Sequence, residues 1–258
     1  MKQAAHTILP FAAAYLPQID YMEEARRKHT IHGLIEVDVT RVRRYLRDYK
    51  ARTGEALSFT GFIATCVARA VDQNKQLHAY RNWRNQLILF DEVDVNIIVE
   101  REAGDTRMGT PYVIRAANTK TFRQIHQEVR AAQATPAKAF KRVGGYRFIP
   151  TFMRRLFWRM LLHNPYWMKR IAGTVSITAV GMFGKGAGWG LPISGYTLTV
   201  TLGGMAEKPG IVDGRIEIRE YLSVTITVDH DIVDGVPAAR FIQQLKELIE
   251  SGYGLAEG

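Results

Sequence analysis

The chain has 258 residues, a formal net charge of +10, 47% hydrophobic residues and 23% charged residues, a composition typical of folded globular proteins that excludes global disorder. Its single cysteine, Cys66, excludes an internal disulfide framework and a cysteine-based zinc site, and we expect no metal site of another kind. No stretch reaches the roughly 18 uncharged apolar residues that cross a bilayer, and Pro10 interrupts the short apolar run at 8–14, so we expect a cytoplasmic protein.

The first half of the chain alternates between helical and extended patterns. Residues 1–20 are expected to form an N-terminal arm. The predicted helices carry charged or amphipathic patterns and cover 23–29, 40–49, 55–74 and 119–132. Alternating apolar residues predict a strand over 34–39. Two β-rich runs at 86–90 and 93–99 flank Asp91-Glu92, and this arrangement predicts a hairpin.

The second half begins with a break in the pattern. Residues 133–170 contain helix-breaking prolines and glycines, followed by an aromatic and basic run that predicts a helix over 152–160. A glycine-rich loop at 181–190 comes after one predicted strand and before three more. The four strands are expected at 174–178, 196–202, 215–219 and 222–228. Asp213-Gly214 is typical of a hairpin turn.

The last element is the strongest helical pattern in the chain. Pro237 stands at its first turn, where a missing backbone N–H is harmless, and Gly252 ends it. We find no internal repeat of 20–50 residues. Helices and strands alternate irregularly, with consecutive strands near the end, which favours a mixed sheet with helices packed on it in one domain.

His230 is the residue whose position is most informative about chemistry. The strand over 222–228 leads into Asp229-His230, and a helix begins at Pro237. Strand ends often present catalytic groups from a rigid scaffold, and imidazole is the side chain best matched to accepting a proton near neutral pH. A turn histidine without any chemical role is the alternative.

The motif His230-x-x-x-Asp234-Gly235 at the end of a strand resembles the signature of the chloramphenicol acetyltransferase and dihydrolipoamide acyltransferase superfamily. Further blocks resemble the catalytic domain of the 2-oxo acid dehydrogenase acyltransferases in order and spacing. They are 93–99, the Pro-rich turn expected at 110–115, the segment Gly-Thr-(strand)-Gly-Met-Phe-Gly at 173–184, and 234–241. The resemblance runs from about residue 20 to about residue 252.

This resemblance implies an α/β fold, a two-layer sandwich of a mixed β-sheet with packed helices, similar to chloramphenicol acetyltransferase. It also implies that residues 21–258 form a single acyltransferase catalytic domain behind the arm at 1–20. The lipoyl and subunit-binding modules of the family are not expected here, because the arm is short and no Ala/Pro-rich linker is present.

The resemblance implies roles for two side chains. His230 would remove the proton from the thiol of CoA or dihydrolipoamide, and the thiolate would attack the acyl donor directly, without an acyl-enzyme. Thr178 matches the family's serine or threonine, whose hydroxyl stabilises the tetrahedral oxyanion. Ser176, two residues away on the same face, is the alternative hydroxyl. Thr178 could also be a β-branched strand residue and nothing more.

Asp234 is expected, from the family, to form an ion pair with an arginine and to hold the histidine loop, and Arg26 and Arg27 are the candidates. Asp231 departs from the family, which usually has arginine directly after the histidine. A carboxylate at this position reverses the local charge, which puts the family's usual substrate in doubt more than the general mechanism.

Two other features of the sequence are assigned no catalytic role. The loop 184–190 is rich in glycine, but it lacks Gly-Lys-Ser/Thr, and Pro192 follows it, so a nucleotide-binding loop is excluded. This loop could shape a substrate channel, with Trp189 as a wall. Cys66 lies on the apolar face of a predicted helix and is interpreted as a packing residue.

The segment 138–170 has nine Lys and Arg residues, no Asp or Glu, and interleaved aromatic residues. It can be a solvated basic face on a core-packed helix, a surface for CoA phosphates or a partner, or an amphipathic helix on a membrane surface. We assign no CoA-binding residues.

We therefore expect a CoA-dependent acyltransferase that uses CoA as substrate and carries no lipoyl group on this chain. Its expected partners are acyl-CoA, a lipoyl domain on a separate chain, and two further copies in a homotrimer with active sites between subunits. The glycine-rich tail at 250–258 predicts that assembly stops at the trimer. The alternatives are a non-catalytic trimeric scaffold, or a peripheral membrane or nucleic-acid-binding protein that uses 138–170, although nucleic acid is not expected.

Overall fold

The computed structural model describes residues 6–7, 9–103, 106–135, 143–179 and 186–255. Its centre is a six-stranded mixed sheet with the strand order β1-β8-β7-β6-β4-β5. The strands of this sheet are β1 Thr30–Asp38, β4 Val95–Ala103, β5 Thr106–Ile114, β6 Val175–Ala179, β7 Leu198–Val212 and β8 Arg215–Asp229. A separate two-stranded hairpin pairs β2 Tyr80–Arg81 with β3 Leu87–Ile88.

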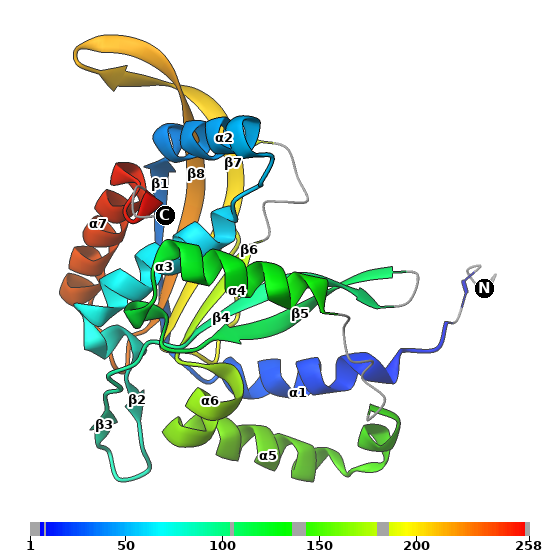
Figure 1. The fold of residues 1–258 in the computed structure, drawn as a ribbon. Helices are drawn as coiled ribbons and strands as arrows, with labels where there is room; N and C mark the ends of the chain where they lie inside the picture. Colours follow the sequence, from blue (N-terminus) through cyan, green and yellow to red (C-terminus); the bar gives the residue numbers. More distant parts are fainter. Residues whose placement is uncertain (1–5, 8, 104–105, 136–142, 180–185, 256–258) are drawn as a thin grey trace, which may run out of the picture.

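Helices cover one face of the sheet and its lower end (Figure 1). The α-helices are α1 Leu16–Ala25, α2 Thr40–Thr53, α3 Phe59–Asp72, α4 Phe122–Ala134, α5 Thr151–His163, α6 Pro165–Ala172 and α7 Gly235–Ser251. The 3-10 turns are η1 Ala13–Tyr15, η2 Lys75–His78, η3 Ala117–Thr119 and η4 Val143–Phe148. No helix in these described ranges is both long and apolar enough to cross a membrane.

The two faces of the sheet differ in chemistry because side chains alternate along each strand. Val200 of β7 and Ile226 of β8 point into the core, where α3, α4 and α7 contribute residues such as Phe62, Ile125 and Phe241. The opposite face carries serine and threonine hydroxyls on β6, β7 and β8. The expected fold, a mixed sheet with helices packed on it, is confirmed.

Most predicted elements are present with shifted ends. The helices predicted at 40–49, 55–74, 119–132 and 152–160 correspond to α2, α3, α4 and α5, and the final helix corresponds to α7. The helix predicted at 23–29 is instead α1, which begins at Leu16. Pro17 at its start has a backbone angle already suited to a helix. Residues 26–29 leave the helix and lead into β1.

Two further predictions were wrong. The hairpin predicted around Asp91-Glu92 does not form: β3 pairs with β2, whose turn is held by Asn82, and β4 pairs with β5 and β6. The Pro-rich segment expected as a turn at 110–115 lies largely within β5. Strand β5 is at the edge of the sheet, where Pro111 can lack its N–H without leaving a partner unpaired.

The strands predicted at 215–219 and 222–228 are one continuous strand, β8, which pairs with β7 in a long hairpin (Figure 1). The predicted turn at Asp213-Gly214 is confirmed, with φ angles of 49° and 76°. The register shifts between Leu202 and Met205. There a Cβ on Gly203 would lie 2.0 Å from the carbonyl oxygen of Gly188, so only glycine allows the segment at 186–189 to approach this strand.

Candidate active site

His230 follows the last residue of β8, and its side chain is exposed to solvent. Its backbone is fixed: the amide of His230 donates a 2.7 Å hydrogen bond to the carbonyl oxygen of His29, just before β1 begins. His230 therefore lies at the end of a strand and before a helix, as predicted from the sequence, and its exposed imidazole is accessible to solvent.

Asp229 builds the turn that carries His230. Its buried carboxylate accepts a 2.7 Å hydrogen bond from Lys28 Nζ and a 3.2 Å bond from the amide of Asp231. Its carbonyl oxygen accepts hydrogen bonds from the backbone amides of Ile232 and Val233. Both the side-chain carboxylate and the backbone carbonyl of Asp229 therefore hold the turn in place. Sequence reasoning missed Lys28 and Asp229, although a carboxylate directly before the motif histidine, at the end of an apolar strand, was a visible signal.

Asp231 and Asp234 lie on the outer side of the same turn. Asp231 Oδ1 lies 3.0 Å from Nδ1 of His29. The Asp234 carboxylate is exposed and forms no ion pair with another described residue. Arg27, one of its two expected partners, pairs with Glu24 instead. Within one chain, the ion pair that holds the histidine turn is therefore Lys28–Asp229.

Replacing Lys28 by alanine should destabilise this turn. The Asp229 carboxylate would stay buried without its cation, while Lys28 itself is partly exposed, so we expect the free energy of unfolding to fall by roughly 1–3 kcal/mol. Urea denaturation at pH 7 measures this change. Arg26→Ala, at an exposed position two residues away, is the control and should change stability by less than about 0.5 kcal/mol. Equal effects of the two substitutions would contradict a role for the Lys28–Asp229 pair.

Thr178 lies in β6 on the hydroxyl-bearing face of the sheet, half-buried. The register places it beside Thr201 of β7, which lies beside Thr225 of β8. Ser176 begins a parallel row with Thr199 and Thr227, and the Thr227 hydroxyl is 2.9 Å from Nδ1 of His32 in β1. Both hydroxyls considered from the sequence, Thr178 and Ser176, therefore face the same side of the sheet.

Two hydroxyls in the Thr178 row are buried and have no hydrogen-bond partner in the part of the chain that the structure describes. Among the described residues, nothing forms a hydrogen bond with Thr201 Oγ1 or Thr225 Oγ1. A buried polar atom without a hydrogen bond lowers stability and calls for an explanation in the structure. In the other row, Ser194 bonds Thr199 at 2.6 Å and His32 bonds Thr227, while Asn96 Oδ1, beside Ser176, has no hydrogen-bond partner among the described residues.

His230 and Thr178 are far apart within one chain. Thr178 is level with Thr225, two strands away, and His230 lies five residues further along β8. With a rise of about 3.3 Å per residue and a spacing of about 4.8 Å between strands, the two residues are roughly 20 Å apart. One copy of the chain does not bring the expected base and the expected hydroxyl together.

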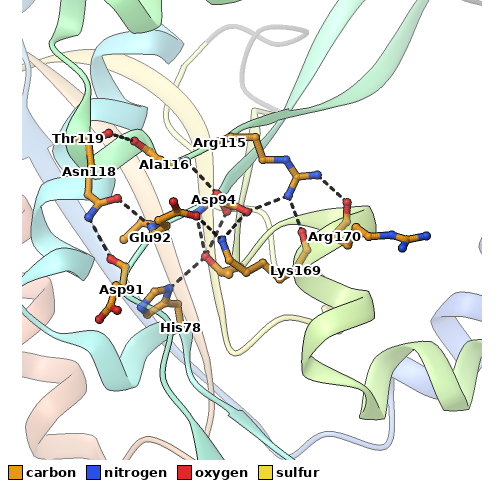
Figure 2. A network of polar contacts seen from close by, with 12 residues as sticks. His78, Asp91, Glu92, Asp94, Arg115, Ala116, Asn118, Thr119, Lys169 and Arg170 are labelled. Atoms are coloured by element: carbon orange, nitrogen blue, oxygen red, sulfur yellow. Dashed lines mark hydrogen bonds and ion pairs between the residues drawn. The ribbon is translucent and has the colours of Figure 1, made fainter.

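An ionic network around the buried carboxylate of Asp94 fixes the start of β6, the strand that carries Thr178 (Figure 2). Asp94, directly before β4, accepts hydrogen bonds from Arg115 at 2.8 Å, from Lys169 at 3.0 Å and from the amide of Ala116 at 2.9 Å. The amide of Thr174 donates to the Asp94 carbonyl oxygen at 2.8 Å. Burial by itself raises the pKa of Asp94, but the hydrogen bonds from Ala116, Arg115 and Lys169 outweigh it and leave the pKa lowered.

His78 lies at the edge of this network, fully buried, with Nδ1 3.1 Å from the Thr174 hydroxyl. Burial, with added repulsion from Lys75, lowers its pKa from 6.5 to about 4. Between these two values, the unfolded chain binds a proton that the folded chain does not. Stability should therefore fall as the pH drops from about 6.5 to about 4, by roughly 2–3 kcal/mol for this residue.

We expect His78→Gln to flatten that pH dependence, because glutamine does not titrate. Urea denaturation midpoints at pH 7, 5.5 and 4.5 measure the effect, with the exposed His163→Gln as the control that should retain the wild-type slope. Parallel pH profiles for His78→Gln and wild type would show that His78 does not contribute to the loss of stability in acid.

Cys66 and Trp189 take no direct part in this arrangement. Cys66 is buried in the core, and burial raises the pKa of its thiol, so it is a packing residue as predicted. Trp189 lies on the sheet, where its indole Nε1 donates to the carbonyl oxygen of Ile35 at 3.2 Å. The residues of the predicted glycine-rich loop before 186 lie outside the described ranges.

Comparison with known proteins places these features in a family. The model of the 2-oxoacid dehydrogenases acyltransferase (catalytic domain) matches residues 19–141 and 169–256. The lipoamide acyltransferase component of the branched-chain alpha-keto acid dehydrogenase complex of Bacillus subtilis (strain 168) is 23% identical over 223 residues, which cover 84% of this chain and 46% of that protein. The chain thus spans about half the length of this relative.

Solved structures agree on the fold. A probable dihydrolipoamide acetyltransferase from Listeria monocytogenes 4b F2365 superposes with a TM-score of 0.68 at 21% identity, covering 96% of each chain. A chloramphenicol acetyltransferase superposes with a TM-score of 0.50 at 13% identity, covering 93% of this chain and 98% of the other. With the family model matching most of its residues, this chain belongs to the 2-oxoacid dehydrogenase acyltransferase (catalytic domain) family.

Proposed function

We propose that this protein is a CoA-dependent acyltransferase that moves an acyl group between CoA and a thiol acceptor, such as a dihydrolipoyl group. The observation that carries the proposal is the exposed His230 side chain on a turn whose backbone is fixed by Lys28, His29 and Asp229. A general base needs this combination, because it must be accessible to its substrate and still hold a defined direction.

In the proposed reaction, the His230 imidazole takes the proton of the acceptor thiol. A free thiol has a pKa of about 8.5, close enough to that of imidazole for effective general-base assistance. The thiolate attacks the carbonyl carbon of the acyl-CoA thioester and forms a new C–S bond. The tetrahedral intermediate then breaks its bond to the CoA sulfur, which takes the proton back from the imidazolium. No acyl-enzyme is formed, and the products are free CoA and the acylated acceptor thiol.

Thr178 is proposed to stabilise the oxyanion of that intermediate by donating its hydroxyl hydrogen. A single donor of this kind typically contributes about 2.7–4 kcal/mol to the transition state. The neighbouring unsatisfied hydroxyls of Thr201 and Thr225 support a polar site at this row, since a ligand or a second chain placed there would give them partners. Ser176 remains the alternative donor.

We further propose that the active site lies between two subunits of a homotrimer, with His230 from one copy and Thr178 from the next. The separation of roughly 20 Å within one chain supports this arrangement, because a single copy cannot place both side chains at one thioester carbonyl. Residues 21–258 would act as one catalytic domain, and the lipoyl group would come from a domain on a separate chain. Asp234, which is exposed on the turn that carries His230, would hold this turn through contacts at the subunit interface.

The experiment is an acyl-transfer assay with a panel of acetyl-, succinyl- and branched-chain acyl-CoAs, with and without dihydrolipoamide. Free CoA and acylated dihydrolipoamide are separated by chromatography and quantified. We expect CoA release to require the acceptor and to match product formation one to one. A burst of CoA without acceptor would contradict direct transfer. A folded protein that transfers no acyl group in the panel would contradict the activity.

A further inference from the structure

Helix α5 lies in a segment that the family match leaves out. The two matched segments stop at residue 141 and resume at 169, so 142–168 lies outside the family match. In Figure 1, α5 runs alongside α1 at the lower end of the molecule, away from the helices α3, α4 and α7 that cover the sheet. Its role is therefore not explained by the acyltransferase fold.

The inner side of α5 combines the buried leucines Leu161 and Leu162 with a set of polar contacts. The buried Arg154 forms an ion pair with the buried Asp20 of α1, at 3.2 Å. Tyr146 donates its hydroxyl to the same carboxylate at 2.7 Å, and the indole of Trp158 donates to Tyr146 at 3.0 Å. The rings of Tyr21 and Trp158 pack edge to face. These contacts hold α5 on α1 in one orientation.

The outer side of α5 is apolar and exposed. It consists of large side chains spaced along the helix, of which Phe152 has 72% of its surface in contact with solvent: Phe152, Met153, Leu156, Phe157 and Met160. At 3.6 residues per turn these positions fall within an arc of about 140°. A helix at the surface of a globular protein normally buries its apolar side and turns its charged side outward.

Basic side chains border this apolar face. Arg155 and Arg159 are exposed and lie one turn apart beside it, and exposed Arg147 in η4 and Arg170 in α6 lie before and after the helix in the sequence. No Asp or Glu occurs between residues 138 and 170. A second copy of the chain would bring like charges together on this face, whereas phosphate groups above an apolar layer would complement both of its features.

We propose that α5 binds the surface of an anionic lipid membrane. Its apolar side would enter the boundary between headgroups and acyl chains, while Arg155 and Arg159 contact lipid phosphates. Helix α5 has 13 residues and is therefore about 20 Å long, shorter than the roughly 30 Å hydrocarbon layer, so it would lie along the surface. The proposed acyltransferase would work at the membrane, and this inference does not depend on that activity.

Vesicle co-sedimentation of the full chain tests the proposal. We expect binding to phosphatidylcholine vesicles with about 30% phosphatidylserine, weakening as NaCl is raised, and at least about tenfold weaker binding to pure phosphatidylcholine. Phe152→Ser/Leu156→Ser should weaken binding to the anionic vesicles about tenfold or more, because two large apolar side chains would no longer be transferred from water into the lipid layer. Arg155→Glu/Arg159→Glu should have a similar effect.

Two matched controls separate α5 from the rest of the surface. Ile211→Ser/Ile216→Ser removes two isoleucines that are 81% and 80% exposed on the β7–β8 hairpin, and Arg41→Glu/Arg44→Glu reverses two exposed charges on α2. Both controls should bind vesicles like wild type. The α5 variants should retain acyl transfer measured without lipid.

Equal loss of binding in the α5 variants and their controls would overturn the proposal, as would equal binding to neutral and anionic vesicles. A different occupant would be revealed by the same variants. If the wild-type chain associates beyond its basal state in sedimentation velocity without lipid, and Phe152→Ser/Leu156→Ser abolishes this, the face is an interface between copies. Salt-sensitive binding to DNA that depends on Arg155 and Arg159, without vesicle binding, would indicate nucleic acid instead.

Discussion

His230→Ala should lower the turnover of acyl transfer by about 10² to 10⁴-fold while the protein remains folded, because the thiol then loses its general base. The substitution removes only an exposed side chain. The hydrogen bond at this position comes from the backbone amide to the carbonyl oxygen of His29, which alanine retains. Steady-state kinetics with the best acyl-CoA of the panel measure the effect.

The control for this substitution is His163→Ala, which removes another exposed histidine and should leave turnover unchanged. Thermal denaturation should give similar midpoints for both variants and wild type. A folded His230→Ala protein with turnover near that of wild type would exclude His230 as the base.

Thr178→Val should lower turnover by roughly 2.7–4 kcal/mol of transition-state stabilisation, which corresponds to a loss of about 10²- to 10³-fold. Valine has the shape of threonine and suits a strand, so β6 should be preserved and only the hydroxyl lost. The kinetic signature is a lower kcat at nearly constant KM, because the hydroxyl acts on the oxyanion and not on the bound thioester.

Thr178→Ser is the matched variant, since it keeps the hydroxyl, and it should retain most of the activity. Ser176→Ala tests the neighbouring row and should have a smaller effect than Thr178→Val. If valine at 178 is tolerated while Ser176→Ala is inactive, the oxyanion is held by Ser176 and the assignment of the hydroxyl is wrong.

The parts of the fold that the sequence predicted well are those governed by local patterns. Helical spacing in α3 and α7, and the Asp213-Gly214 turn, depend on side chains within a few residues of one another. The position of His230 at a strand end was also predictable, because the alternation in 222–228 stops directly before it. The role expected for Thr178 came from the resemblance to the family and not from the local pattern of residues.

The parts that could not be predicted depend on contacts distant in sequence. Strand pairing decided that β4 lies between β5 and β6 and not in a hairpin with β3, and no local signal in 86–99 carries that information. The pair Lys28–Asp229 spans 201 residues, and the network around Asp94 draws on Arg115 and Lys169. In α5 an arginine is buried while two phenylalanines are exposed, so its orientation became visible only in the structure.

If His230 of one copy and Thr178 of another act on one thioester, mixing two inactive variants should restore activity. His230→Ala and Thr178→Val chains are unfolded together in equal amounts, refolded and assayed. In random trimers, about one quarter of the channels combine an intact His230 with an intact Thr178 from the next copy. We expect the mixture to recover about a quarter of wild-type activity, far above either variant refolded alone. Activity no greater than the average of the two variants, in trimers shown to be mixed, would contradict it.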